Sequence, residues 1–254
     1  MTANVIESKN LSVGYGEKVL LKNADFEVHQ KDIFVIMGGS GCGKSSLLKV
    51  LTGLMPPLEG SFNLLGVDFQ NTENEKISFL RQQTGILYQS GALFSSMTLA
   101  ENVAMPLRQY TSYSPHSIDE LVSLKLALVG LSGYEDYYPS EISGGMKKRA
   151  GLARALALDP KIVYFDEPSA GLDPVSSARL DDLMLEINAN LGTTLVVVTH
   201  ELQSIFAIAN NSIYLDASTK TITGRGNPRE LLKNPPNERI AQFLTRGKEN
   251  EKRA

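Results

Sequence analysis

One glycine-rich segment of the chain has the residue types and spacing that favour phosphate binding. Residues 38–45 read Gly-Gly-Ser-Gly-Cys-Gly-Lys-Ser, which fits the P-loop pattern of a glycine, four residues and then Gly-Lys-Ser. Glycines let backbone N–H groups turn toward phosphate oxygens, and a following helix N-terminus adds partial positive charge. Lys44 would bring a full charge to the β- and γ-phosphates, and Ser45 would offer its hydroxyl to Mg²⁺. The residues expected to surround a bound nucleoside triphosphate are Gly38, Gly39, Ser40, Gly41, Cys42, Gly43, Lys44, Ser45 and Ser46.

Two adjacent carboxylates follow an apolar run in the second half of the chain. Asp166 and Glu167 come directly after Ile-Val-Tyr-Phe at 162–165. An acidic pair that merely ends a strand is common, but a P-loop upstream gives this pair a specific use. Asp166 would hold Mg²⁺ directly or through water, and Glu167 would orient and polarise an attacking water. The sequence therefore predicts hydrolysis of the bound triphosphate.

The elements that would position these residues alternate between buried strands and helices. Continuous apolar runs at 33–37, 162–165 and 194–198 predict strands of a parallel sheet that is covered on both faces. Apolar periodicity predicts helices at about 46–53, 147–158, 175–191 and 201–209. This alternation is typical of an α/β fold.

The remaining segments have a different character. Alternation at 5–14 and 19–28, joined by a turn at 14–17, predicts antiparallel strands near the N-terminus. Leucines at 121, 124, 128 and 131 recur at helical spacing, so the block from about 90 to 150 is predicted to be a helical subdomain. Residues 213–215 and 221–223 are predicted to form a hairpin, and 240–244 a short amphipathic helix. That helix could clasp a second chain or pack on its own domain.

Composition limits the classes of protein that remain. The 254 residues are 42% hydrophobic and suffice for one domain, expected at 4–245 and followed by a polar tail at 246–254. A net charge of −3 and a pI of about 5.7 do not favour nucleic acid as a partner. The single cysteine cannot form an internal disulfide, and no apolar run reaches the roughly 20 residues that span a bilayer. If the protein works at a membrane, we expect another chain to hold it there.

Further motifs identify a family resemblance. Ile-Ser-Gly-Gly-Met at 142–146 opens a predicted helix and resembles the signature sequence of ABC ATPases, which binds phosphate at a helix N-terminus. Its position between the P-loop and Asp166 matches the family order. The resemblance implies a P-loop NTPase fold with a RecA-like core sheet, an N-terminal antiparallel β subdomain and an inserted helical subdomain. Met146 stands where the signature usually has glutamine, so a side-chain amide that could bind the signature loop to its neighbours is missing.

The ABC resemblance also implies roles for single residues. Tyr15 resembles the aromatic that stacks on adenine, Gln89 the glutamine that reaches Mg²⁺ and the water, and His200 the switch histidine at the γ-phosphate. The resemblance implies a homodimer with ATP and Mg²⁺ at two shared sites. Mg²⁺ would be bound by Ser45, Gln89 and Asp166. The set implied for one site is Lys44, Ser45, Gln89, Asp166, Glu167 and His200 of one chain with Ser143 and Gly145 of the other. Gly144 of the signature and Asp173 of the D-loop, which would lie at the dimer seam, are implied as further nucleotide-binding residues.

Two segments resemble one branch of the family. Residues 143–150 around Met146, and 89–94 with 99–103, are similar to ATPases of MCE-type lipid transporters of the maintenance-of-lipid-asymmetry system. This resemblance implies a peripheral subunit at the cytoplasmic face of a bacterial inner membrane. The implied partners are an integral-membrane permease (MlaE-like), an MCE-domain protein (MlaD-like) and a STAS-domain protein (MlaB-like), with phospholipid as cargo and no nucleic acid. An ABC transporter for amino acids or lipoproteins, and a non-transport ABC ATPase, are the alternatives.

Two more expectations concern reactivity and coupling. Cys42 lies beside Lys44 at a predicted helix N-terminus, and both features favour a thiolate that maleimide would modify. An inert small residue is the alternative interpretation. The segment after Gln89, with Leu93, Phe94 and Glu101, is predicted to form the surface that couples hydrolysis to a permease.

Overall fold

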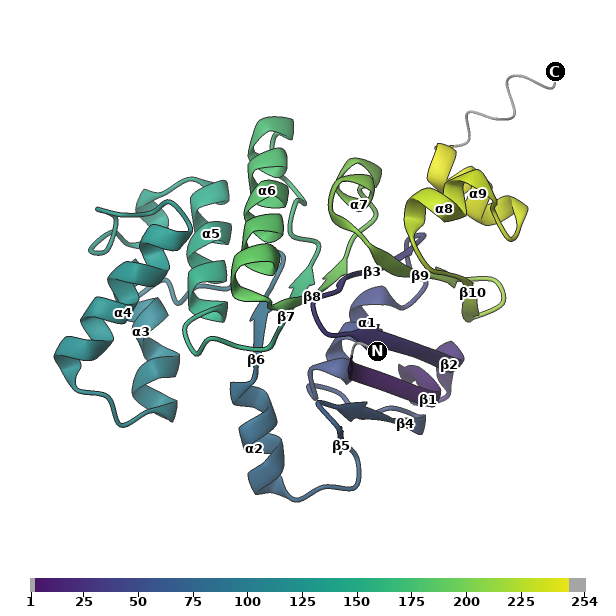
Figure 1. Ribbon diagram of the computed structural model, residues 1–254, viewed down its shortest axis with the longest axis horizontal. Coiled ribbons are helices and arrows are strands. Elements are labelled where there is room, and N and C mark those ends of the chain that lie inside the picture. The colour runs from purple at the N-terminus through teal and green to yellow at the C-terminus, as the bar shows by residue number, and fades with distance from the viewer. Residues whose placement is uncertain (1–2, 247–254) are drawn as a thin grey trace.

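The larger of two sheets carries the strands that precede the predicted site residues (Figure 1). The computed structural model describes residues 3–246. The sheet has the order β10-β9-β3-β8-β7-β6, in which β9, β3, β8, β7 and β6 are parallel and β10 is antiparallel to β9. Its strands are β3 (Ile33–Gly38), β6 (Thr84–Leu87), β7 (Ile162–Asp166), β8 (Thr194–Val198), β9 (Asn211–Asp216) and β10 (Thr221–Arg225). The predicted parallel sheet and the C-terminal hairpin are both confirmed.

The central strands read as unbroken apolar runs because both faces of the sheet are covered. Every residue of β3 and β8 is buried. Alternate side chains of β3 enter different cores: Val35 and Met37 join the core that the later helices form, whereas Phe34 and Ile36 join the core beneath the smaller sheet. This period of two fixes which elements pack on which face.

The smaller sheet is antiparallel and packs over the first helix. Its order is β2-β1-β4-β5, with β1 (Asn4–Tyr15), β2 (Lys18–His29), β4 (Glu59–Leu64) and β5 (Val67–Asp68). Helix α1 (Lys44–Leu51) buries Leu47 and Leu51 in the core that this sheet shares with β3. The first two strands confirm the predicted N-terminal hairpin, and their contact with α1 brings their turn close to the end of the P-loop.

A group of helices forms the block predicted at 90–150. It contains α3 (Leu99–Tyr110), α4 (Pro115–Leu128), a 3₁₀ turn (Pro139–Glu141) and α5 (Gly144–Ala155). Helix α4 buries Ile118, Val122 and Leu126, which recur every four residues. The predicted helices of this block are therefore confirmed. Of the leucines that indicated them, Leu131 is buried and Leu121 packs against the core, whereas Leu124 and Leu128 are exposed.

Helix α2 (Asn74–Gln82) was not predicted from the sequence. Only Leu80 of this helix is buried, so the apolar period that would reveal it is missing from the sequence. It precedes β6 and lies apart from the predicted site residues.

The C-terminal helices pack on the domain they belong to. Helices α6 (Pro174–Leu191) and α7 (Leu202–Ile208) cover one face of the sheet, and α8 (Pro228–Lys233) and α9 (Glu238–Thr245) follow the hairpin (Figure 1). Ile240 and Leu244 are buried, and the Phe243 ring meets Tyr214 edge-on at 5.2 Å. Of the two alternatives for this amphipathic helix, packing on its own domain is observed. Residues 247–254 of the predicted polar tail lie outside the described residues.

None of the helices within residues 3–246 combines the length and apolar character needed to cross a bilayer.

A buried carboxyl between α6 and α7 yields a prediction about stability. Asp181 is 7% exposed, its Oδ2 accepts a hydrogen bond from Ser204 Oγ at 2.8 Å, and its Oδ1 has no partner within residues 3–246. Burial raises the pKa of Asp181 to about 6. A raised carboxyl pKa stabilises the fold below the unfolded-state value of this carboxyl, and that contribution is lost as pH rises through about 6.

We therefore predict that Asp181→Asn stabilises the protein by up to about 3 kcal/mol at pH 7.5 and by only about 1 kcal/mol at pH 4.5. Thermal unfolding at the two pH values measures the difference. Glu186→Gln, which neutralises an exposed carboxylate on the same helix, is the control and should change little at either pH. If Asp181→Asn changed the stability by the same amount at pH 7.5 and at pH 4.5, the raised pKa of Asp181 would be contradicted.

Candidate active site

The predicted P-loop, acidic pair and switch histidine meet at the carboxyl edge of the parallel sheet. The P-loop follows β3, Asp166 ends β7, and His200 follows β8. Strand β8 lies between the other two, with Val198 in register with Ile36 on one side and Asp166 on the other. Loops that leave neighbouring parallel strands at the same edge form the usual ligand site of such sheets.

The P-loop needs glycine where its backbone turns against the sheet. Gly38 has φ 150°, and a Cβ there would lie 2.5 Å from Leu215 O and 2.8 Å from Cys42 Sγ. Lys44 is buried, and its Nζ donates to the carbonyls of Gly38 at 2.9 Å and Gly39 at 3.0 Å. The loop therefore wraps around its own ammonium group, which leaves a positive charge at the centre of the turn.

Ser45 and Asp166 bring two oxygen ligands together. Ser45 Oγ donates to Asp166 Oδ1 at 3.0 Å, across 121 residues of sequence. Burial raises the pKa of Asp166, and the hydrogen bond from Ser45 opposes that shift. A divalent cation would favour the charged form of this partly desolvated carboxylate. Hydroxyl and carboxylate oxygens suit Mg²⁺, which usually completes its shell with phosphate oxygens and water, so the residues present fit this ion.

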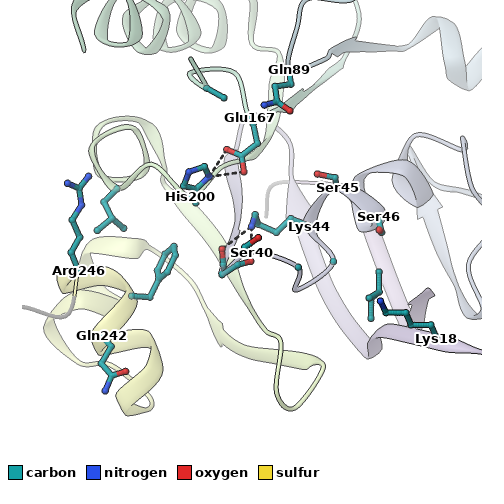
Figure 2. A pocket seen from close by; sticks show the side chains of 18 residues that line it. Lys18, Ser40, Lys44, Ser45, Ser46, Gln89, Glu167, His200, Gln242 and Arg246 are labelled. Carbon is teal, nitrogen blue, oxygen red and sulfur yellow. Dashed lines mark hydrogen bonds and ion pairs between the residues drawn. The ribbon is translucent and has the colours of Figure 1, made fainter. Parts of the chain in front are cut away.

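Glu167 and His200 form the second pair of the site. His200 Nδ1 lies 3.0 Å from both carboxylate oxygens of Glu167, so a hydrogen bond there places the proton on Nδ1 (Figure 2). Glu167 has φ 48°, a left-handed backbone conformation that is uncommon for a residue with a side chain. Its N–H donates to Val198 O at 2.9 Å, which fixes this turn against β8. Such local strain is maintained only where surrounding contacts fix the conformation.

The P-loop, Glu167 and His200 line one open cavity of about 910 Å³, whereas Asp166 lies behind Ser45 and is not part of its wall (Figure 2). Gln89 reaches it from the segment after β6, opposite Lys44 and Ser45 of the P-loop. The C-terminal helix forms a further wall. The sequence did not predict this wall, because α9 carries no motif and follows the P-loop by almost 200 residues. The lining residues that sequence reasoning missed are Lys18, Leu20, Ala170, Leu202, Gln242, Phe243 and Arg246.

Tyr15 lies beside the P-loop helix rather than in the wall of this cavity. Its ring is 51% exposed, and its hydroxyl is 3.3 Å from Ser46 Oγ. The ring is therefore held near α1 with much of its surface free for stacking. Ser46 itself lines the cavity, so the tyrosine stands at its margin.

The signature residues lie away from the P-loop cavity within one chain. Ser143 caps α5 by accepting a hydrogen bond from the Met146 N–H at 3.3 Å. Ser143 and Gly145 line a separate cavity of about 500 Å³. Asp173 caps α6, where it accepts from the N–H groups of Val175 and Ser176, each at 3.0 Å. The remaining predicted signature residue, Gly144, begins α5 and is exposed.

The predicted reactive thiolate at Cys42 is wrong. The side chain is only 2% exposed and belongs to the core beneath the smaller sheet. Burial raises the pKa of the Cys42 thiol and outweighs the opposing influence of Lys44. Only the backbone of this residue takes part in the loop, so the inert alternative describes the cysteine better.

Comparison with known families identifies the class of protein. The model of the ABC transporter family matches residues 21–170 of the chain. The chain belongs to the ABC transporter family. It is an ATP-binding and ATP-hydrolysing cassette, and such cassettes work as dimers with membrane permeases. This assignment confirms the predicted P-loop ATPase fold, with its antiparallel sheet, parallel core and helices.

Several curated proteins are similar over most of the chain. The intermembrane phospholipid transport system ATP-binding protein MlaF of Haemophilus influenzae is 39% identical over 96% of this chain and 91% of its own length. The MlaF protein of Escherichia coli K12 is 37% identical, with 95% and 89% covered. The probable ribonucleotide transport ATP-binding protein mkl of Mycobacterium leprae is 41% identical over 94% of this chain. The chain spans 68% of that mycobacterial relative's length.

Solved structures agree with this family. A dimeric ATP-binding cassette in a post-hydrolysis state with ADP and Pi has a TM-score of 0.79 at 26% identity, with 87% of this chain and 98% of that chain covered. The CbiO1 protein of Clostridium perfringens, part of an ABC transporter complex, has a TM-score of 0.83 at 25% identity. That match covers 98% of this chain and 99% of the other.

The geometry around Glu167 predicts how its substitution affects catalysis. Glu167→Gln removes the proton acceptor and keeps the shape, so kcat for ATP hydrolysis should fall by about 10²–10⁴-fold while ATP binding persists. Steady-state hydrolysis and nucleotide binding measure the two effects. Glu201→Gln is the matched control, because Glu201 lies 3.6 Å from the other ring nitrogen of His200. If Glu167→Gln hydrolysed ATP as fast as the unaltered chain, Glu167 would not be the proton acceptor.

Proposed function

We propose that the chain is the ATP-hydrolysing subunit of a transporter that moves phospholipid between the inner and outer membranes of a bacterium. The observation that carries this proposal is the similarity to MlaF proteins, which extends over nearly the full length of both chains. The names of those relatives describe an intermembrane phospholipid transport system. The ATP site and the surface beside Gln89 supply the two parts that such a motor needs, hydrolysis and coupling.

At the phosphates, the chain's own groups bind and orient the substrate. Backbone N–H groups of the P-loop and the Lys44 ammonium would bind the β- and γ-phosphates, and the Lys44 hydrogen bonds to Gly38 and Gly39 would give way to phosphate oxygens. Ser45 and Asp166, with Gln89, would hold Mg²⁺. When bound, Mg²⁺ neutralises charge that develops on the β- and γ-phosphate oxygens.

Glu167 and His200 would act on the attacking water. Water attacks the γ-phosphorus, the bond to the β,γ-bridging oxygen breaks, and the carboxylate of Glu167 accepts the proton that the water loses. The Nδ1–H group of His200 donates a hydrogen bond to the Glu167 carboxylate and so orients that carboxylate toward the cavity. Most of the rate enhancement would come from positioning and charge stabilisation.

A second copy of the chain would complete each site. Ser143 and Gly145 stand outside the chain's own P-loop cavity, and the N-terminus of α5 carries free backbone N–H groups that favour an anion. In a head-to-tail homodimer, Ser143, Gly144 and Gly145 would bind the γ-phosphate held by the other copy. Asp173 would lie at the seam, and Tyr15 would stack on the adenine.

An exposed aromatic surface beside the segment after Gln89 supports coupling to a membrane protein. This aromatic surface consists of Phe94, Tyr134, Tyr137 and Tyr138, of which Phe94 is 47% exposed. The Leu99 N–H donates to Tyr137 O at 2.9 Å, so the two loops that carry these rings meet at the start of α3. Glu101 caps α3 and Leu93 packs on the core, so substitution of either residue would also affect the fold. Phe94 and Tyr137 therefore test contact with a permease better.

The proposed assembly is peripheral to a membrane. The aromatic surface would dock an integral-membrane permease (MlaE-like) at the cytoplasmic face of the inner membrane. An MCE-domain protein (MlaD-like) and a STAS-domain protein (MlaB-like) would complete the transporter. Phospholipid would be cargo of the complex rather than a ligand of this chain.

Ribonucleotide transport is a second candidate function. The Mycobacterium leprae relative bears that name and is as similar in sequence as the MlaF proteins. Two features favour phospholipid. The alignment with MlaF covers both chains almost completely, and residues 143–150 resemble MCE-type ATPases. Analysis of the cargo separates the candidates directly.

Isolation of the native complex tests the proposal. The tagged full chain would be purified from gently solubilised membranes, and its proteins, lipids and nucleotides identified by mass spectrometry. We expect a permease, an MCE-domain protein and bound phospholipid. If the complex contains a permease and ribonucleotide bound outside the ATP site, ribonucleotide rather than phospholipid is the cargo. If only soluble proteins copurify, a transport role is contradicted.

The same purification tests the aromatic surface. Phe94→Ala combined with Tyr137→Ala should reduce recovery of the permease and abolish its stimulation of ATP hydrolysis, because aromatic anchors dominate such contacts. Tyr113→Ala is the matched control, since this tyrosine is 55% exposed at the opposite end of α3. Unchanged recovery and stimulation in the double variant would move the coupling surface elsewhere.

A further inference from the structure

Helix α5 contains a buried lysine that binds backbone rather than an acid. Lys148 is 5% exposed, and its Nζ donates to the carbonyl oxygens of Pro168 at 2.6 Å and Ala170 at 2.5 Å. Within residues 3–246, no carboxylate lies within ion-pair distance of this ammonium. Burial lowers the pKa of Lys148, and the nearby Glu167 carboxylate opposes that shift. Burying a lysine that has no acidic partner costs free energy, so we expect its hydrogen bonds to have a function.

The two carbonyls belong to the loop that follows Glu167. This loop turns tightly, since the Ala170 N–H donates to Glu167 O at 3.1 Å. Glu167 adopts a left-handed backbone conformation, so the direction of its carboxylate depends on the contacts that hold the loop. Apart from the hydrogen bond within the turn, the loop is bound to α5 by the two hydrogen bonds from Lys148.

We propose that Lys148 is a positioning residue for ATP hydrolysis, which holds the Pro168 and Ala170 carbonyls and thereby fixes Glu167 relative to helix α5. The inference rests on the proposed function of Glu167 as proton acceptor. Lys148 does not touch the nucleotide in this account. It acts on the reaction through the loop.

The position of Lys148 on α5 ties Glu167 to the signature sequence. The helix starts after Ser143, and at 1.5 Å per residue Lys148 lies about 7.5 Å along it. In the proposed homodimer, Ser143 contacts the nucleotide of the other copy. A shift of α5 on that contact would move the Pro168–Ala170 loop of the same chain, so each chain's Glu167 would respond to the neighbouring site.

A second contact shows that α5 holds loops in this way elsewhere. Arg154 donates to the carbonyls of Gly91 at 3.0 Å and Ala92 at 2.9 Å, just after Gln89. The Gln89 segment packs directly on the helix, since a Cβ on Gly151 would lie 2.8 Å from Gly91 O. One rigid helix therefore contacts the loops that carry Glu167 and Gln89.

Substitution of Lys148 tests the proposal in the full-length protein. Lys148→Met keeps the length of the side chain but cannot donate, so kcat should fall by about 10- to 100-fold while KM for ATP stays within about twofold. Lys148→Arg, which can still donate to both carbonyls, should recover most of the activity. Lys147→Met removes a charge from the neighbouring position and should leave kcat unchanged.

Thermal stability separates positioning from simple packing. Lys148→Met removes the free-energy cost of burying a charge, but it also leaves two carbonyl oxygens without a hydrogen-bond donor. Because these two effects oppose each other, the melting temperature should change little. Unchanged kcat in Lys148→Met would overturn the proposal. A loss of kcat that Arg does not rescue, accompanied by a matching fall in melting temperature, would also overturn it.

A double-mutant cycle tests the link to the signature sequence. The effects of Ser143→Ala and Lys148→Met on kcat should be non-additive if both act through α5. Additive effects would overturn the link. Glu167→Gln in parallel keeps the two proposals apart. Activity in Glu167→Gln would refute the proton acceptor itself, whereas an inactive Glu167→Gln beside a fully active Lys148→Met would refute only the positioning residue.

Discussion

The parallel pairing of β3, β8 and β7 is the constraint on which the site depends. Because Val198 is in register with both Ile36 and Asp166, the three strands end together, and their loops cannot avoid one another. The hydrogen bond from Ser45 to Asp166 and the contact of His200 with Glu167 both cross this edge. The sheet itself is an unbroken apolar layer buried on both faces, so hydrophobic packing sets the register and the register sets the chemistry.

Helix α5 adds a second level of organisation. Lys148, Arg149 and Arg154 donate to carbonyls of separate loops, and burial lowers the pKa of each of these side chains. The arrangement explains how a helix without a charged residue in the P-loop cavity can influence both Glu167 and Gln89. Within the basic run Lys-Lys-Arg at 147–149, Lys148 and Arg149 therefore have structural contacts inside the chain.

The sequence predicted those parts of the site whose chemistry is local. The P-loop and the pair Asp166 and Glu167 are recognisable because glycine spacing and strand-end carboxylates are short-range patterns. Prediction failed where tertiary packing decides. Cys42 is buried in the core beneath the smaller sheet, and α2 buries only Leu80, so no apolar period in the sequence indicates that helix. The wall that α9 adds to the cavity depends on how the hairpin of β9 and β10 returns the chain to the site, which no motif records.

In the proposed homodimer, one chain's signature sequence completes the ATP site of a second copy. Cross-linking of two differently tagged full-length chains tests it most directly, one with Ser40→Cys and the other with Ser143→Cys, both also carrying Cys42→Ala and Glu167→Gln. We expect an interchain disulfide that joins the two tags and forms only with ATP and Mg²⁺. If the variants still bind ATP and no such cross-link forms, or if it forms equally without nucleotide, the shared-site account is contradicted.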